Sequence, residues 1–161
     1  MIRLAMLTFA IFTVSSSLAM PLHATERENL SLMQMISPWR YPDAQGQGAQ
    51  MSDAATIDVN GARTTQSIVG KTVMTTDASI DKVIEFYKAK LDPTSSENNK
   101  DGIEVDPSGR SVIFSDDSKG RPFAMHTIFI NTRNMSTVLV ITRGKDETKT
   151  HISWKQYRRL D

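Results

Sequence analysis

Cysteine is absent from the 161-residue sequence, so the chain cannot form a disulfide, a thiolate zinc site, an iron–sulfur cluster or a cysteine nucleophile. The sequence also has no large excess of positive or negative charge, because it contains 19 Lys and Arg residues and 18 Asp and Glu residues. Dedicated nucleic-acid-binding domains carry a strongly basic patch, so we expect no nucleic-acid partner. The length fits one domain and excludes a large multidomain enzyme.

Recognisable catalytic motifs are missing too. The sequence has no G-x-S-x-G elbow, no G-x-G-x-x-G or Walker phosphate loop and no H-E-x-x-H zinc motif. The acidic turn at 116–120 lacks the alternating oxygen ligands and the terminal Glu of a calcium-binding EF-hand loop. We therefore assign no catalytic residue, no cofactor and no metal site from motifs.

The first 24 residues have the pattern of a secretory signal peptide. Arg3 precedes an apolar run at 4–14, and small residues follow with candidate cleavage sites after Ala19 and Ala24. The run is shorter than the roughly 20 residues that a membrane-spanning helix needs. We expect cleavage at one of these two sites and an exported protein, periplasmic or extracellular, with no stable membrane anchor after cleavage.

Residues 25–65 are predicted to form an N-terminal arm and a flexible lead-in. The capping-box sequence Thr25-Glu26-Arg27-Glu28 favours a short amphipathic helix at 26–36, which Ser37-Pro38 would end. From 43 to 65 the composition shifts to Gly, Gln, Ala, Ser, Asp and Asn. Such a stretch buries too little apolar surface to offset its ordering entropy, so we expect a loop there.

Residues 66–161 are predicted to form a single α+β domain. A β-branched segment at 66–76 indicates a strand, and Asp77 is the expected N-cap of the next helix. The helix is indicated by apolar residues at positions i, i+3, i+4, i+7 and i+11, and Asp92-Pro93 would end it. These apolar positions are Ile80, Val83, Ile84, Tyr87 and Leu91.

Five further segments, after a polar loop at 94–102, have the composition of strands. The connections between them are too short for parallel pairing, which needs a dozen or more residues. We therefore expect an antiparallel meander sheet of about five or six strands with one amphipathic helix packed on a face. The five segments are 103–105, 110–115, 123–131, 136–143 and 148–157.

Two of these segments, 123–130 and 138–141, are apolar at both odd and even positions, which indicates that both of their faces need burial. One helix can cover only one face. The second face must then be covered by the segment 26–36, by the pair Trp39 and Tyr41, or by a second copy of the chain. We favour the N-terminal segment, because an intramolecular cover avoids the entropy cost of association, and a homodimer is the alternative.

Residues 41–91 contain a series of short motifs: Tyr41-Pro42-Asp43-Ala44, a Gly-rich gap, Thr75-Thr76-Asp77-Ala78-Ser79 and the helix pattern Val83-x-x-Phe86-Tyr87-x-x-x-Leu91. In this layout the segment resembles a family of small exported bacterial domains of unknown function. The resemblance implies a bacterial envelope setting and a helix-on-sheet fold, and it implies no catalytic residues. Asp43 stands where such domains often have Gly.

The surplus of apolar residues and the missing motifs favour a non-catalytic envelope module. We expect it to bind a partner protein or a small ligand through a sheet face or a rim of loops. The contact residues depend on which sheet face the helix covers. They are either His126, Ile128 and Ile130, or Phe123, Met125 and Phe129.

The alternative hypothesis is a small hydrolase or a metal-dependent enzyme centred on His126 with Asp116 or Asp117. It requires these side chains to converge in one pocket, because acid–base partners need hydrogen-bond reach. His151 is expected two strand spacings from His126, roughly 10 Å away. That distance is too long for both histidines to bind one metal ion.

Overall fold

The computed structural model describes residues 30–91, 97–98, 104–105 and 109–160. The predicted signal peptide, the capping box at 25–28 and the Asp92-Pro93 helix stop lie outside these residues. Among the helices that are described, none combines the length and the apolar character needed to cross a membrane.

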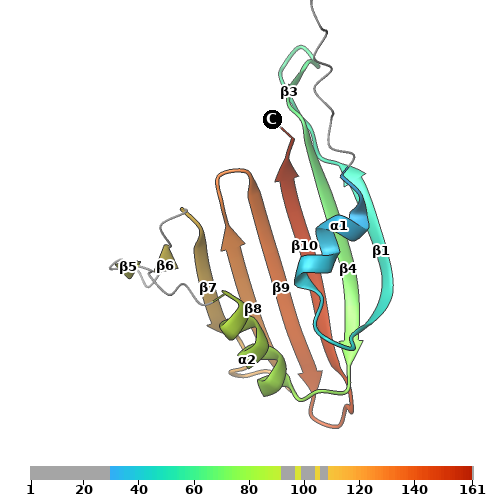
Figure 1. Ribbon diagram of the computed structural model, residues 1–161, viewed down its shortest axis with the longest axis vertical. Coiled ribbons are helices and arrows are strands. Elements are labelled where there is room, and N and C mark those ends of the chain that lie inside the picture. Colours follow the sequence, from blue (N-terminus) through green and yellow to red (C-terminus); the bar gives the residue numbers. More distant parts are fainter. Residues whose placement is uncertain (1–29, 92–96, 99–103, 106–108, 161) are drawn as a thin grey trace, which may run out of the picture.

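The body of the fold is an antiparallel sheet of eight strands, in the order β1-β4-β10-β9-β8-β7-β6-β5 (Figure 1). Two further strands, β2 (Thr56–Ile57) and β3 (Arg63–Thr65), pair with each other in a hairpin that projects beyond the sheet. The strands of the main sheet are β1 (Gln45–Asp53), β4 (Ser67–Thr76), β5 (Glu97–Asn98), β6 (Glu104–Val105), β7 (Ser111–Asp116), β8 (Phe123–Asn131), β9 (Met135–Gly144) and β10 (Thr150–Arg159).

The predicted α+β class and the antiparallel sheet are confirmed, but the meander of five or six strands with one helix is wrong, because the sheet has eight described strands in an order that is not strictly sequential and carries two described helices. Strands β5 to β10 follow one another across the sheet, and β10 then pairs with β4, so that β4 lies between β1 and β10. Helix α2 (Ile80–Leu91) leads from β4 toward the opposite edge. A helix of this length spans about 18 Å, which is nearly four strand spacings. The later strands can therefore start at the distant edge and return to β4.

The predicted strands at 66–76, 110–115, 123–131, 136–143 and 148–157 correspond to β4, β7, β8, β9 and β10, with ends that differ by at most two residues. The predicted helix at 80–91 has the bounds of α2. Its expected cap is wrong, because the Ser79 hydroxyl accepts the hydrogen bond from the Lys82 backbone N–H at 3.4 Å. The Asp77 carboxylate instead pairs with Lys149 at 3.0 Å.

The first described helix, α1 (Leu32–Ile36), begins later than the predicted 26–36. Ser31 and Gln34 form its capping box: the Ser31 hydroxyl accepts from the Gln34 N–H, and the Gln34 side chain accepts from the Ser31 N–H. A single 3₁₀ turn, η1 (Ser37–Trp39), follows, and its proline stands where the helix was expected to stop.

The predicted loop at 43–65 is wrong, because β1 occupies much of it. All nine residues of β1 are exposed, and the strand is held by its backbone pairing with β4. Composition measures how much apolar surface a segment can bury, and β1 buries almost none. An edge strand can instead be stabilised by hydrogen bonds to a neighbour that is itself firmly placed.

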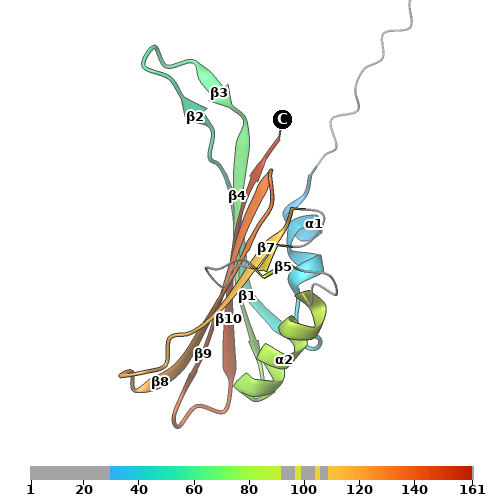
Figure 2. The same cartoon turned by 90° about the vertical axis from the view of Figure 1, so that its left-hand side faces the viewer.

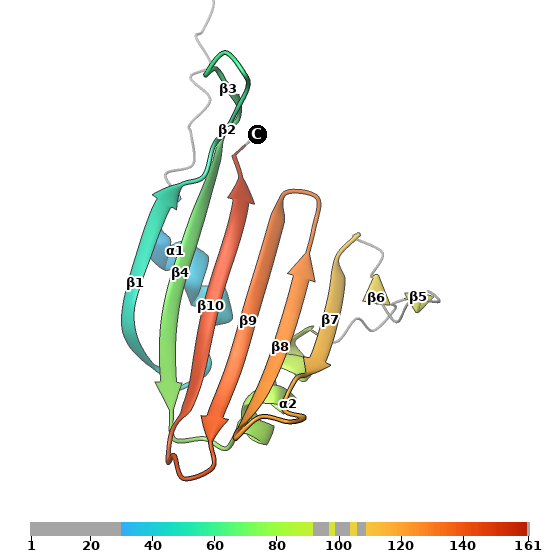
Figure 3. The same ribbon diagram turned by 180° about the vertical axis from the view of Figure 1, so that it is seen from behind.

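Both helices lie on the same face of the sheet (Figure 2). The opposite face, seen in Figure 3, carries no covering element within the described part of the chain. The expectation that the N-terminal segment or the pair Trp39 and Tyr41 covers this second face is therefore wrong. β-branched and aromatic residues are favoured on either face of a strand, so their presence on both faces does not by itself require burial.

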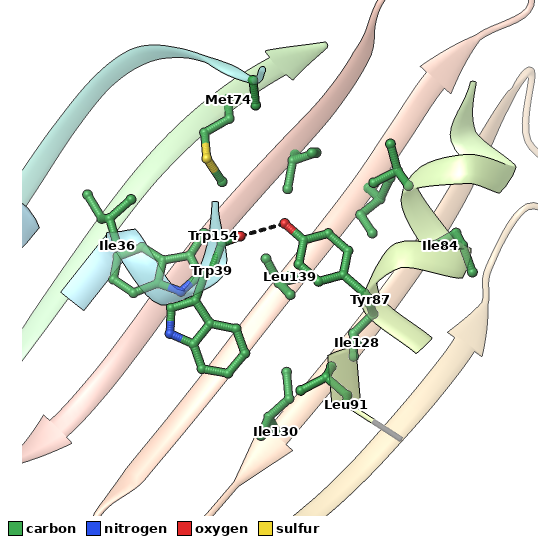
Figure 4. Close-up of a cluster of buried hydrophobic side chains, with 14 of the residues drawn as sticks. Ile36, Trp39, Met74, Ile84, Tyr87, Leu91, Ile128, Ile130, Leu139 and Trp154 are labelled. Carbon is green, nitrogen blue, oxygen red and sulfur yellow. Dashed lines mark hydrogen bonds between the residues drawn. The ribbon is translucent and has the colours of Figure 1, made fainter. Parts of the chain in front are cut away.

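Two tryptophans and one tyrosine form the centre of the core beneath the helices (Figure 4). The Tyr87 hydroxyl of α2 donates a hydrogen bond to the Trp39 carbonyl oxygen at 2.7 Å, in a buried position. Burial also raises the pKa of Tyr87 above its usual range. The Trp154 ring lies over Gly70, where an added Cβ would stand 3.1 Å from the ring. Glycine at this position therefore leaves room for the Trp154 ring and the Met35 side chain over β4.

The Tyr41-Pro42-Asp43-Ala44 element is a tight turn closed by a hydrogen bond from the Ala44 N–H to the Tyr41 carbonyl oxygen at 3.1 Å. Asp43 has φ = 58°, the one positive φ at a non-glycine residue in the described ranges. Proline at the second position and a positive φ at the third are the features of a type II turn. Glycine adopts a positive φ without strain, so the turn would also accept glycine at position 43.

Replacing Tyr87 with Phe should lower the free energy of unfolding by about 1–3 kcal/mol, because the buried Trp39 carbonyl then loses its donor. Urea denaturation measures this change. Tyr41→Phe is the matched control, since no hydrogen bond of its hydroxyl is found in the described structure and its ring stays against Phe86. Equal losses in the two variants would contradict a specific role for the Tyr87–Trp39 bond.

Replacing Asp43 with Val should lower the free energy of unfolding by about 1–2 kcal/mol, because a β-branched residue is strained at positive φ. Asp43→Gly should leave stability within about 0.5 kcal/mol, since glycine adopts this conformation without strain but loses more entropy on folding. Thermal or urea unfolding of the two variants distinguishes them. A Val variant as stable as the Gly variant would show that the turn is not left-handed at this residue.

Candidate functional site

The open face is the face of the sheet opposite α1 and α2, and no described helix covers it. Directly opposite residues of antiparallel strands project to the same side, so the strand register assigns each side chain to a face. Trp154, Leu139 and Ile128 are opposite one another across β10, β9 and β8 and lie in the core. Their sequence neighbours therefore project from the open face.

A hollow of about 640 Å³ lies on the open face where β1, β4, β10 and β9 meet. Volumes of 300–1,000 Å³ are usual for sites that hold small molecules. Val73, Val138 and Val140 supply its apolar floor, and Val73 is 39% exposed. The hollow is also lined by polar side chains of β1, β4 and β10: Gln47, Gln50, Lys71, Ser153 and Lys155.

A β-bulge in β1 shapes one wall of this hollow. The register with β4 shifts between Gly46 and Ala49, so two residues of β1 face one residue of β4. Gly48 has φ = 122°, a conformation that favours glycine. The Thr72 hydroxyl donates a hydrogen bond to the Gly48 carbonyl oxygen at 2.6 Å. The bulge therefore bends β1 at a defined point and is held there by β4.

Beyond the hollow, the apolar surface continues over β8 and β7. Phe129 is opposite both Val138 of β9 and Ile113 of β7, and it is 39% exposed. Phe123 and Met125 lie on the same face of β8 and are half-buried. The open face thus presents apolar side chains from the hollow to Phe129 and Ile113, and Met125 and Phe123 lie beyond the polar Thr127 on the same face of β8.

The six predicted contact residues divide between the two faces. Ile128 and Ile130 are fully buried in the core next to α2 and are inaccessible (Figure 4). His126 shares their face and is partly exposed at its end. Phe123, Met125 and Phe129 lie on the open face, so they are the set that a partner can reach.

The structure brings only two of the three side chains of the enzyme hypothesis close to each other. Asp116 and His126 are opposite each other on β7 and β8, with 3.8 Å between a carboxylate oxygen and Nδ1. Asp117 points to the other side, where its carboxylate accepts hydrogen bonds from Ser115 and Thr127, both at 2.8 Å. Hydrogen bonds from Ser118 lower the pKa of Asp116, and those from Ser115 and Thr127 lower the pKa of Asp117. Carboxylates with lowered pKa values are weak proton acceptors.

The two histidines lie on opposite faces of the sheet, with β9 between their strands. His151 is 3.7 Å from the Glu147 carboxylate at the end of the β9–β10 turn. Within the described ranges, no group of three or more His, Cys, Asp or Glu side chains is placed to hold a metal ion.

Sequence reasoning did not identify the residues of the hollow. Gln47 and Gln50 lie in the segment that was predicted to be a loop, so no face could be assigned to them. Lys155 was predictable, because buried and exposed residues alternate along β10. This alternation places Lys155 on the face of the sheet opposite to Trp154. No family model, curated protein or solved structure matches the chain.

Replacing Asp117 with Asn should make stability less sensitive to acid. The lowered pKa of the carboxylate means that its contribution to stability is present above about pH 3.9 and is lost as the pH falls through the folded-state value. The difference between urea midpoints at pH 7 and pH 2.5 should therefore be smaller in Asp117→Asn than in the parent. Asp146→Asn, in the exposed β9–β10 turn, is the control and should keep the parent difference. An unchanged difference in Asp117→Asn would contradict this assignment.

Proposed function

We propose that this protein is a non-catalytic binding module of the bacterial envelope, exported by its N-terminal signal peptide, and that it binds its ligand on the open face. The observation that carries the proposal is the hollow of about 640 Å³ with its apolar floor on an uncovered sheet face. Exposed apolar surface costs free energy in water, so a contiguous patch of it points to a binding role. The bacterial setting rests on the family resemblance and on the signal-peptide pattern.

A small ligand suits the hollow better than a flat protein partner does. The site is concave, it is lined by residues from four strands, and it combines an apolar floor with a few polar side chains. This is the usual design of small-molecule sites, where apolar contacts supply affinity and a few polar groups fix orientation. The extension over Phe129 and Ile113 offers further contact to a ligand longer than the hollow.

The hydrolase alternative rests on one observation, the 3.8 Å approach of Asp116 to His126. It ranks second because Asp117 is bound to Ser115 and Thr127 on the other face of the sheet. Hydrolytic activity that His126→Gln abolishes, in a protein that stays folded, would reverse this order.

The double variant Val138→Thr/Val140→Thr should weaken the binding of the neutral apolar dye Nile red about tenfold, because each replaced methyl group loses roughly 0.8 kcal/mol of apolar contact. The measurement is a fluorescence titration of the purified folded protein. Threonine keeps the β-branched shape of valine, so the strand is preserved.

Val69→Thr is the matched control, because Val69 lies on the same face of β4 but outside the hollow. It should bind the dye as the parent does. A parent protein that binds no dye, or a control that loses as much binding as the double variant, would contradict the proposed site.

A further inference from the structure

Lys71 of β4 and Lys155 of β10 are directly opposite each other on the open face, at the side of the hollow. Both side chains are exposed, and neither forms a salt bridge or a hydrogen bond with another side chain in the described structure. Like charges directly opposite in an antiparallel sheet repel each other and destabilise the pair. The sheet therefore carries a local positive charge that an anion would neutralise.

The other side chains of the hollow do not neutralise this charge. No Asp or Glu is among its lining residues, and the polar side chains beside the lysines are uncharged. In the register, Ser153 lies between Val73 and Val140 in one cross-strand row. The lysine pair occupies the next row on the same face, in which Lys155 is directly opposite Val138. A cationic pair thus directly borders the valines, and the Ser153 hydroxyl lies among them.

On the basis of the proposed binding function, we infer that the ligand is an anionic amphiphile of the fatty-acid type. Its carboxylate binds between Lys71 and Lys155, and its hydrocarbon chain lies over Val73, Val140 and Val138. Charge-assisted contacts to two ammonium groups orient the head group, and burial of the chain supplies the apolar part of the affinity.

A second copy of the chain fits this face less well. In a two-fold symmetric contact through the hollow, each copy would present the same lysine pair to the other. Interface cores are depleted of Lys, because desolvating an unpaired ammonium group is costly. The same charges that favour a small acid therefore disfavour self-association through the hollow.

The test compares laurate with dodecanol, its uncharged analogue of equal chain length, in displacing Nile red from the purified protein. Laurate should bind about tenfold more tightly than dodecanol at low salt, and the difference should shrink as salt is added. In the double variant Lys71→Gln/Lys155→Gln the two compounds should bind equally, while dodecanol binds as it does to the parent. Lys82→Gln on α2 removes one positive charge from the helix side and should keep the laurate preference.

Stability gives a second readout that does not depend on the ligand. Lys155→Gln should raise the urea midpoint of the free protein, because it removes the repulsion across β4 and β10. An unchanged or lowered midpoint would contradict the uncompensated charge on which the inference rests.

The outcomes separate the two proposals. Equal binding of laurate and dodecanol to the parent would contradict the inference that the ligand has an acidic head group, but it would not contradict the apolar binding site. Failure of Nile red and of both lipids to bind overturns the proposed function itself. A concentration-dependent dimer that Val138→Thr/Val140→Thr dissociates, seen by light scattering, overturns the inference in favour of a second copy.

Discussion

The hydrogen bond between Tyr87 and the Trp39 carbonyl, buried among the two tryptophans, is the contact on which the arrangement of this fold depends. It joins α2 to the segment that follows α1, and it keeps both helices on one face of the sheet. A buried carbonyl without a donor is costly, so this pairing favours one placement of the N-terminal segment over the others. The open face is the direct consequence, because the described chain has no other helix to cover it.

The regular elements were predictable where local pattern and tertiary packing agree. The apolar spacing from Ile80 to Leu91 marks a helix that buries one side, and the bounds of α2 match it. The strand positions followed from β-branched segments and short turns. The strand order could not be predicted, since the pairing of β10 with β4 depends on how far α2 carries the chain across the sheet.

The N-terminal part shows why composition alone misleads. The exposed residues of β1 resemble those of a loop, and hydrogen bonds to β4 make that segment a strand. The same limit applies to the candidate site, because four of the twelve residues that line the hollow come from β1 and its bulge at Gly48. Strand alternation predicts that the candidate contact residues divide into two sets on opposite faces of β8. The sets are Phe123, Met125 and Phe129, and His126, Ile128 and Ile130. Which set lies on the open face depends on where the helices pack.

The chemical character of the site follows from the difference between the two faces of the sheet. One face of the sheet is closed by large aromatic and aliphatic side chains, and the other combines valines with an uncompensated pair of lysines. An NMR titration of the labelled protein with laurate would show whether this second face binds ligand. We expect chemical-shift changes at residues that line the hollow, Lys71, Val73, Val138, Val140 and Lys155. Changes confined to His126 and Asp116, or no changes, would rule out binding at this face.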